Sequence, residues 1–217
     1  FLKQISMIDD PLVLYNTNES DTIAQKAQEE IDAGFVNSQG FTWCSVGRLI
    51  PVKRFDRMIR IQKRLIEEGY PVRLLILGEG ELRQELERQV KACGVEDSVE
   101  FLGYQTNPYK YVSRCDLFVC SSMSEGFSTA ATEALIVGTP VCTVEVSGMK
   151  EMLGEHDEYG IVTENSEEAL YQGIKRLLDD PALLAHYRKK AAERGAMFST
   201  ESTVRAVEEM LEGLLER

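Results

Sequence analysis

The chain has 217 residues, which suits one α/β domain with a short appended segment. Hydrophobic residues make up 43% and charged residues 28%, a globular composition that excludes a disordered tail, a collagen-like rod and a disulfide-rich mini-protein. The 36 acidic residues outnumber the 24 basic ones and give a net charge of −12, which argues against a nucleic-acid partner. Any bound anion must therefore be held by a few local cations and backbone amides.

The cysteines and the apolar runs indicate the compartment. Five cysteines occur, an odd number without a C-x-x-C pair, and most lie inside apolar runs. We expect reduced, buried thiols in the cytosol and neither a disulfide frame nor a zinc site. No apolar stretch reaches about 18 residues and the first segment lacks a signal-peptide core, so the sequence predicts a cytoplasmic protein. The chain opens on Phe1, not on Met, which suggests part of a larger protein.

Six short apolar runs, each followed by turn residues and a helical pattern, predict the fold. They are residues 41–47, 72–78, 98–103, 116–122, 140–146 and 159–163. Near-continuous Val, Ile, Leu and Phe runs that alternate with helices are typical of strands buried on both faces of a parallel sheet. The predicted fold class is α/β, a doubly wound, Rossmann-like parallel sheet of about six strands with helices on both faces.

The segments between these runs have helical periodicity. Helices are predicted over 55–66, 81–93, 166–178, 181–194 and 201–215, the second ended by Gly94 and the last two separated by a turn at Gly195. In the first of them the arginines oppose an apolar stripe, and we expect a solvated face there; contact with an anionic membrane is the alternative. These arginines are Arg54, Arg57, Arg60 and Arg64.

The last helix also carries an apolar stripe, formed by Val204, Val207, Leu211, Leu214 and Leu215. Three interpretations stay open: the stripe packs back on the core, it reaches another part of the parent protein, or it supports a dimer.

Residues 1–40 differ from the rest of the chain. A short strand over 12–16 and a helix over 21–33, ended by Gly34, supply too little core to fold alone. The sequence therefore predicts two units, a connector of residues 1–40 that packs on a main domain of residues 41–217.

Ligands in an open parallel sheet bind beyond the carboxyl ends of the strands, where loops and helix amino ends converge. The first such loop holds Gly47, Arg48 and Lys53. Glycine allows close approach of the backbone, arginine offers a planar fork and lysine a point charge, so together they suit a diphosphate. Taken alone, the short string is better explained by two solvated cations.

The loop over 121–129 carries the second signal. Ser128 or Thr129 is a natural N-cap for a helix that runs to Val137, and the amides at its start form an anion site. Glu125 precedes this helix and Glu133 lies one turn into it. Eight helical residues span about 12 Å, which is wider than the separation of about 5–9.5 Å in glycosidase acid pairs. Hydroxyl recognition fits these acids better, with solvated carboxylates as the alternative.

Two other patterns carry less weight. His156 and His186, the only histidines, are expected to be solvated, and the sequence predicts no metal site. The string GEGELR has Arg83 at the third glycine position of a dinucleotide fingerprint, which makes a dehydrogenase a weak alternative.

The segments GRLIPVK, LLILGEGELRQEL, VEFLG, SEGFSTAATEALIVGTPV and EYGIV, in this order, resemble the carboxyl-terminal donor domain of the family 4 retaining glycosyltransferases of GT-B fold. The resemblance covers residues 41–217. Residues 12–33 are similar to the interdomain connector of that family, although residues 16–19 read Asn-Thr-Asn-Glu in place of the usual Asn-Pro-x-Asp.

The resemblance implies a role for each matching position. Arg48 and Lys53, with the backbone at Gly47, would bind the diphosphate of a nucleotide sugar. Glu125 would bind hydroxyls of the transferred sugar, and Glu133 those of the ribose. Backbone amides would hold the distal phosphate, at Gly126, Phe127, Ser128 and Thr129. A loop would border the base, at Gly103 and Tyr104.

The family also implies retention, no metal ion or other cofactor, a UDP-sugar as the expected donor, and a glycan or lipid-linked acceptor in polysaccharide or glycolipid synthesis. The acceptor domain would lie in an amino-terminal half that the chain lacks, so the chain alone is expected to bind a nucleotide and transfer nothing. A position at the inner face of the membrane is the further expectation. A GT-B sugar-nucleotide epimerase and a non-catalytic nucleotide-binding module remain as alternatives.

Overall fold

The computed structural model describes residues 19–31 and 40–215, the last three by their backbone alone. Six strands form one sheet in the order β3-β2-β1-β4-β5-β6, and each neighbouring pair is parallel. The strands are β1 (Phe41–Val46), β2 (Val72–Leu77), β3 (Val99–Gly103), β4 (Leu117–Cys120), β5 (Val141–Val144) and β6 (Ile161–Thr163). The predicted fold class is confirmed, and each of the six apolar runs contains one strand.

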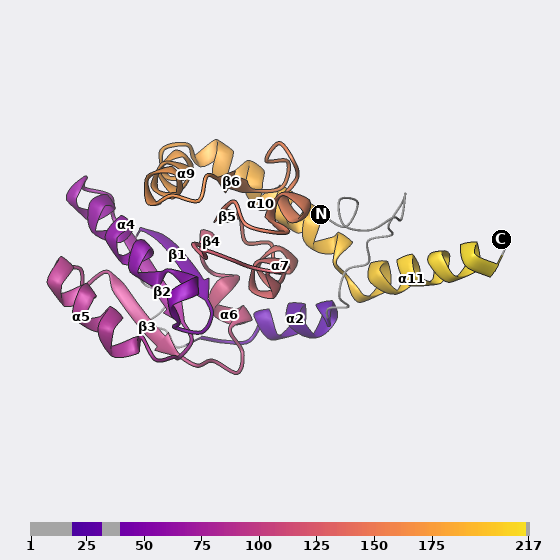
Figure 1. The fold of residues 1–217 in the computed structure, drawn as a ribbon, viewed down its shortest axis with the longest axis horizontal. Helices are drawn as coiled ribbons and strands as arrows, with labels where there is room; N and C mark the ends of the chain where they lie inside the picture. The colour runs from indigo at the N-terminus through magenta and orange to yellow at the C-terminus, as the bar shows by residue number, and fades with distance from the viewer. Residues whose placement is uncertain (1–18, 32–39, 216–217) are drawn as a thin grey trace.

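Helices connect the strands and lie on both faces of the sheet (Figure 1). Before and directly after β1 come α2 (Ser20–Ala27), the 3-10 turn η1 (Pro51–Lys53) and α4 (Phe55–Glu67). The helices that follow β2 to β5 are α5 (Arg83–Cys93), α6 (Tyr109–Val112), α7 (Thr129–Ile136) and α8 (Met149–Leu153). After β6 the chain continues through α9 (Glu167–Asp179), α10 (Pro181–Met197) and α11 (Thr200–Leu215).

The core has two halves because successive strand residues point to opposite faces of the sheet. Trp43 belongs to the half covered by α4, α5 and α9, whereas its neighbour Cys44 belongs to the half covered by α6, α7 and α8. The Trp43 indole donates to Oε1 of Gln62 (2.8 Å), and Nε2 of Gln62 donates to the Val72 carbonyl (2.9 Å). This buried polar pair is therefore satisfied inside the apolar layer.

Local capping chemistry fixes several helix ends where the sequence predicts them. Ser166 accepts from the amide of Ala169 (3.1 Å) at the start of α9, and Ser128 accepts from that of Ala131 (3.4 Å) at the start of α7. Gly94 ends α5 in the left-handed conformation, with φ of +68°.

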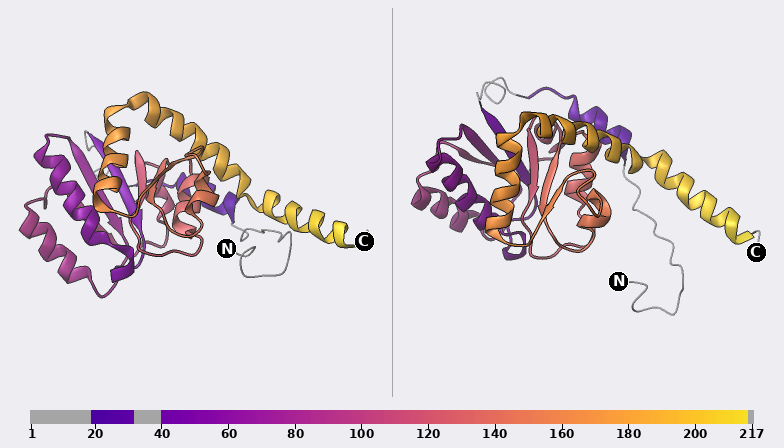
Figure 2. Two further views of the ribbon diagram at one scale, coloured as in Figure 1. Left: turned by 45° about the horizontal axis from the view of Figure 1, so that its top comes forward. Right: turned by 90° about the horizontal axis from the view of Figure 1, so that it is seen from above.

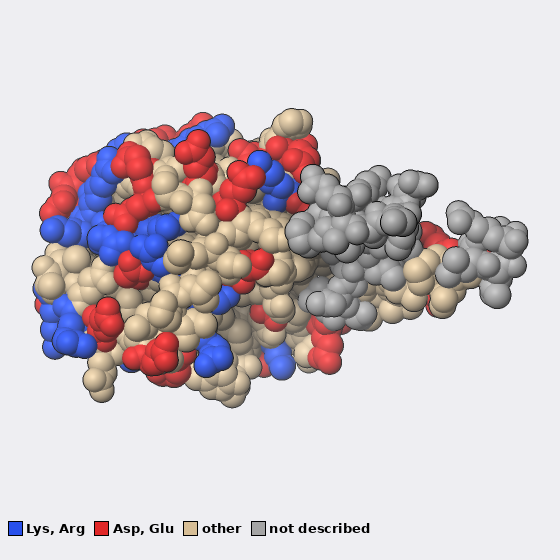
Figure 3. All heavy atoms as spheres, in the orientation of Figure 1, with Lys and Arg blue, Asp and Glu red and all other residues tan. Residues whose placement is uncertain are grey.

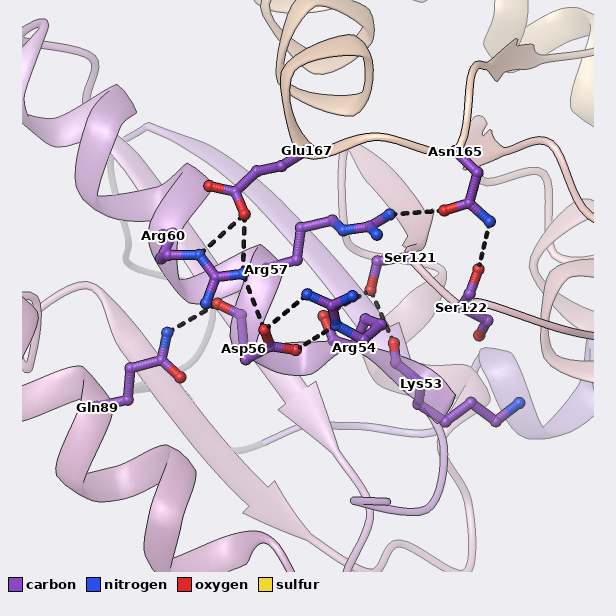
Figure 4. A network of polar contacts seen from close by, with 10 residues as sticks. All are labelled: Lys53, Arg54, Asp56, Arg57, Arg60, Gln89, Ser121, Ser122, Asn165 and Glu167. Atoms are coloured by element: carbon purple, nitrogen blue, oxygen red, sulfur yellow. Dashed lines mark hydrogen bonds and ion pairs between the residues drawn. The ribbon is translucent and has the colours of Figure 1, made fainter. Parts of the chain in front are cut away.

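The expectation of a solvated arginine face on α4 is wrong for Arg57, and the other three arginines are partly exposed but ion-paired. Arg57 is only 6% exposed and donates to Oδ1 of Asn165 (2.9 Å), while Arg60 pairs with Asp56 and Glu167 (2.8 Å each) (Figure 4). Arg64 pairs with Glu168 and lies over the Tyr171 ring. The reason is that α9 packs along α4 and supplies partners from far along the chain, and basic and acidic side chains are interspersed on the visible face (Figure 3).

The turn predicted at Gly195 is also misplaced. Gly195 lies inside α10, and the break before α11 falls at Phe198 and Ser199. A Cβ at Gly195 would overlap the backbone carbonyl of Leu135 in α7. The glycine therefore permits close packing of two helices and does not end one.

The last helix, α11, leaves the body of the structure at the end of α10 (Figure 2). In the described part of its apolar stripe Val204 and Leu211 are exposed and Val207 is half-buried, so this part does not pack back on the core. Within residues 19–31 and 40–215, no helix is both long and apolar enough to cross a bilayer.

Helix α2 is shorter than the predicted 21–33 and packs against α6 and α7. Its last carbonyls accept from side chains of the main body: Lys26 from Asn107 (2.9 Å), and Ala27 from Ser113 (3.3 Å) and Arg114 (3.1 Å). These bonds replace the helical ones that would extend α2. The strand predicted over 12–16 and the glycine expected to end the helix lie outside the described residues, and the division at residue 40 stays a prediction.

Replacing Gly195 by Ala tests the contact between α10 and α7. Alanine has the higher helix propensity by about 1 kcal/mol, but the added methyl group meets the Leu135 carbonyl. We expect a net loss of about 1–3 kcal/mol in the free energy of unfolding, measured by urea denaturation. Ala196→Ser at the exposed neighbouring position should change it by less than about 0.5 kcal/mol. A Gly195→Ala variant more stable than the wild type would contradict the packing argument.

Candidate functional site

The loops after β1 and β4 meet because these two strands pair at the centre of the sheet. The amide of Met123 donates to the Val52 carbonyl (2.8 Å), which joins the two loops through their backbones. The Ser121 hydroxyl lies within hydrogen-bond distance of the carbonyls of Lys53 (2.8 Å) and Arg54 (3.0 Å). The end of η1 is thus held from the neighbouring strand.

Arg54 takes a left-handed conformation, with φ of +54°, at the start of α4. Few residues other than glycine adopt this conformation without a compensating contact. Here Nε and Nη2 of Arg54 donate to the two carboxylate oxygens of Asp56 (2.9 and 3.1 Å). Burial alone would raise the pKa of Asp56, but the hydrogen bonds from Arg54 and Arg60 and their charges lower it to about 2.

Lys53 and Glu125, both predicted site residues, form an ion pair. Nζ of Lys53 lies 2.6 Å from Oε1 of Glu125, and the two side chains are 27% and 11% exposed. The Ser122 hydroxyl donates to the same oxygen (2.5 Å). In Figure 4 the Lys53 side chain extends away from the arginines of α4. The pair therefore makes no direct side-chain bond to those arginines among the described residues, and Ser122 and Asn165 connect it to Arg57.

A cavity of about 390 Å³ opens at the carboxyl ends of β1, β2 and β3. Neither Lys53 nor Glu125 lines it, although the Lys53 side chain passes beside Gly47, which does. The predicted residues Gly47, Arg48, Tyr104 and Glu133 line it. The other lining residues are Val46, Leu77, Gly78, Glu79, Gln105, Thr106, Pro108 and Tyr109. A Cβ at Gly78 would overlap the Gly47 carbonyl, so close packing of the first two loops shapes the floor of the cavity.

The remaining predicted residues do not line the cavity. Gly103 adjoins it, with φ of +68° and a hypothetical Cβ 2.9 Å from Oε1 of Glu79. Ser128 caps α7, and Phe127 packs edge to face on Phe198 with ring centroids 5.9 Å apart. Gly126 and Thr129 are exposed. The structure thus places these four residues of the loop before α7 in capping and packing roles or at the surface.

Glu133 faces the cavity from α7 and has one hydrogen-bond donor among the described side chains. The hydroxyl of Tyr109 donates to its Oε1 (3.0 Å). Burial raises the pKa of Glu133, and the bond from Tyr109 opposes that rise. Burial and the charge of Glu133 together raise the pKa of Tyr109 to about 12.

Sequence reasoning missed Tyr109 and Ser122, which contact the two predicted acids, and the link from Arg57 to Asn165. Asn165 also donates to the Ser122 carbonyl (3.3 Å), which connects the loop after β6 with the loop after β4. Tyr109 directly follows the Asn107-Pro108 pair in the loop after β3, and an aromatic residue at that place is the sequence signal that could have indicated it. The Arg57 contact has no local signal because its partner lies on a distant loop.

Both histidines are exposed, as expected. Among residues 19–31 and 40–215, no group of three or more His, Cys, Asp or Glu side chains is placed to hold a metal ion.

Comparison with known proteins decides the family. Residues 26–194 match the family described as glycosyl transferases group 1. The chain belongs to the group 1 glycosyltransferases. This membership confirms the resemblance to GT-B enzymes of family 4.

Individual relatives of these glycosyltransferases agree. Over 188 residues the chain is 38% identical to the N-acetylgalactosamine-N,N'-diacetylbacillosaminyl-diphospho-undecaprenol 4-alpha-N-acetylgalactosaminyltransferase of Campylobacter jejuni. This alignment covers 86% of the chain and 49% of the relative. The chain also superposes on the crystal structure of a Staphylococcus aureus TarM variant in complex with fondaparinux, alpha-GlcNAc-glycerol and UDP. The TM-score is 0.71 and the sequence identity 25%, over 78% of this chain and 35% of the TarM chain.

The fold is shared more widely. Anabaena HepE in complex with UDP is 22% identical, with a TM-score of 0.80, over 93% of this chain and 57% of that one. The chain spans about half the length of the first curated relatives it matches.

Replacing Asp56 by Asn tests the anchoring of the turn that carries Lys53. The pKa of Asp56 is lowered from 3.8 in the unfolded chain to about 2, so its stabilising effect is complete above about pH 4 and disappears as the pH falls through about 2. Because the side chain is one-third exposed, we expect Asp56→Asn to lower the free energy of unfolding by about 1 kcal/mol at pH 7.

Urea denaturation at a series of pH values measures this difference, which should shrink between pH 4 and pH 2. Asp97→Asn, at an exposed acid outside the ion pairs of the described residues, serves as the control and should change little. A difference that stays constant across this pH range would show that the Asp56 charge is not responsible.

Proposed function

We propose that this chain binds a nucleoside diphosphate sugar and forms the donor half of an enzyme that transfers the sugar, with retention, to a glycan or lipid-linked acceptor. The observation that carries the proposal is the convergence of Gly47, Arg48 and Glu133 on one cavity, with the Lys53 side chain beside Gly47. Cations suit the phosphates of a ligand and a carboxylate that accepts from hydroxyls suits its sugar, so their meeting at one edge of the sheet fits a ligand that contains phosphates as well as a sugar.

Arg48 and Lys53 are assigned to the diphosphate. Cleavage of a glycosyl–phosphate bond leaves negative charge on the departing diphosphate, and fixed cations stabilise that charge more in the transition state than in the ground state. Arg48 lines the cavity with an exposed side chain, and the Lys53 side chain passes beside Gly47. In this proposal the protein supplies the charge compensation itself, without a metal ion or another cofactor.

Glu125 is assigned to hydroxyls of the transferred sugar. Its contacts with Lys53 and Ser122 both use Oε1, and these fix the carboxylate while Oε2 accepts from the sugar. Tyr104, 74% exposed, and Gly103 are assigned to the border of the base.

Relatives support the classes of donor and acceptor. TarM, at 25% identity, was crystallised with UDP, which favours a UDP-sugar. The Campylobacter jejuni relative is named for an acceptor linked to diphospho-undecaprenol, which favours a lipid-linked acceptor and a position at the inner face of the membrane. The Campylobacter jejuni relative is named as a transferase, so an epimerase or a non-catalytic module is less favoured.

We further propose that these 217 residues bind the nucleotide and that transfer needs acceptor-binding groups from outside them. The basis is the share of the relatives' length that the chain spans, 49% for the first two.

A thermal-shift panel of UDP, GDP and ADP tests the proposed function on the 217-residue chain. We expect one nucleotide to raise the melting temperature more than the other two, because the stabilisation grows with the logarithm of the ligand concentration divided by Kd. In Arg48→Ala that nucleotide should bind about 10–100-fold more weakly, the equivalent of a lost hydrogen bond to a charged group. Arg48 suits the test because its loss breaks no hydrogen bond or ion pair identified among the described residues.

Lys91→Ala, which removes an exposed cation from the far end of α5, is the matched control and should leave the shift unchanged. A full shift in Arg48→Ala would exclude Arg48 from the diphosphate site. The absence of a shift with all three nucleotides would contradict the proposed function.

A further inference from the structure

Tyr109 and Glu133 form a hydrogen-bonded pair within the cavity wall. Tyr109 opens the four-residue helix α6, Glu133 lies in the second turn of α7, and their oxygens are 3.0 Å apart. Both residues line the 390 Å³ cavity. Since Tyr109 is the one described side chain that donates to Glu133, the phenol sets the orientation of this carboxylate.

The backbone that carries Tyr109 is fixed on both sides of the tyrosine. Asn107, buried two residues before it, donates to the Lys26 carbonyl and to Oε2 of Glu29 (2.9 Å each). Arg114, beyond the end of α6, donates to the Ala27 and Glu29 carbonyls (3.1 and 3.0 Å). The phenol is therefore held in place before any ligand arrives, which reduces the entropy lost on binding.

The charges around the pair explain why Glu133 needs this donor. Arg48, Glu79 and Tyr104 line the same cavity, and the charge of Glu19, near the start of α2, acts on Tyr109. No lysine, arginine or histidine among the described residues forms an ion pair with Glu133. Burial favours the protonated acid, and the Tyr109 hydroxyl is the group that opposes this.

We propose that Tyr109 is a positioning residue that holds Oε1 of Glu133, leaves Oε2 to accept from the ribose hydroxyls, and thereby makes the site selective for ribonucleotides over 2′-deoxyribonucleotides. The inference rests on the proposed function and adds a residue and a specificity to it. A fixed carboxylate loses a bond when the 2′-hydroxyl is absent and is left with an unpaired, half-buried acceptor. A carboxylate free to rotate discriminates less.

The test is calorimetric titration of the 217-residue chain with UDP and 2′-deoxy-UDP. The wild type should bind UDP about 10–100-fold more tightly, since a hydroxyl bonded to a charged group is lost in the deoxy compound. In Tyr109→Phe the affinity for UDP should fall about 3–10-fold and that for 2′-deoxy-UDP should fall less, so that the preference shrinks. Tyr111→Phe on the same short helix, outside the cavity lining, should keep the wild-type preference.

A double-mutant cycle and a pH series separate positioning from general damage to the fold. If Tyr109 acts through Glu133, Tyr109→Phe should have no further effect in the Glu133→Gln background. Loss of the phenol should also raise the pKa of Glu133, so UDP affinity should decline at a higher pH on acidification in Tyr109→Phe than in the wild type.

Two results overturn the inference and can be told apart. If the wild type binds UDP but Tyr109→Phe keeps both the ribose preference and the pH profile, the positioning role is wrong and the proposed function stands. If the wild type binds neither UDP nor 2′-deoxy-UDP, while GDP and ADP also fail in the thermal-shift panel, the proposed function fails and this inference falls with it.

Discussion

The pairing of β1 with β4 at the centre of the sheet is the constraint on which the site depends. From that pair the chain winds outwards in both directions, through β2 and β3 on one side and β5 and β6 on the other. The loops after the two central strands must therefore leave the sheet side by side, and the bonds from Met123 to Val52 and from Ser121 to Lys53 join them. Residues more than seventy positions apart meet there because of topology, and the Lys53–Glu125 pair is the result.

Electrostatics at this edge depends on a few fixed groups, because the chain as a whole repels anions. With a net charge of −12, attraction of a phosphate must come from local cations, and the proposed function assigns this role to Arg48 and Lys53. The other cations nearby are already engaged: Arg54 and Arg60 hold Asp56, and Arg57 is buried against Asn165. This division leaves the arginines of α4 to support the loops, while Arg48 lines the cavity and Lys53, paired with Glu125, passes beside Gly47.

The sequence allows the fold to be predicted further than the site. Strands buried on both faces produce apolar runs that are visible without any tertiary information, and caps such as Ser128, Ser166 and Gly94 act through bonds a few residues away. The burial of Arg57 and the close contact at Gly195 both depend on a second helix from elsewhere in the chain, so no local pattern could indicate them. Of the predicted site residues, Arg48, Glu133 and Tyr104 line one cavity and Lys53 and Glu125 do not, and the ligand of all five is assigned by proposal.

Helix α6 contacts two parts of the molecule at once. The four residues of this helix and their neighbours anchor the carbonyls at the end of α2 and also place the phenol beside Glu133. A one-residue insertion in this segment would rotate the tyrosine by about 100° relative to the anchoring side chains. A change of length in α6 or in the loop before it, which holds Asn107, must therefore preserve the docking of α2 and the shape of the cavity together.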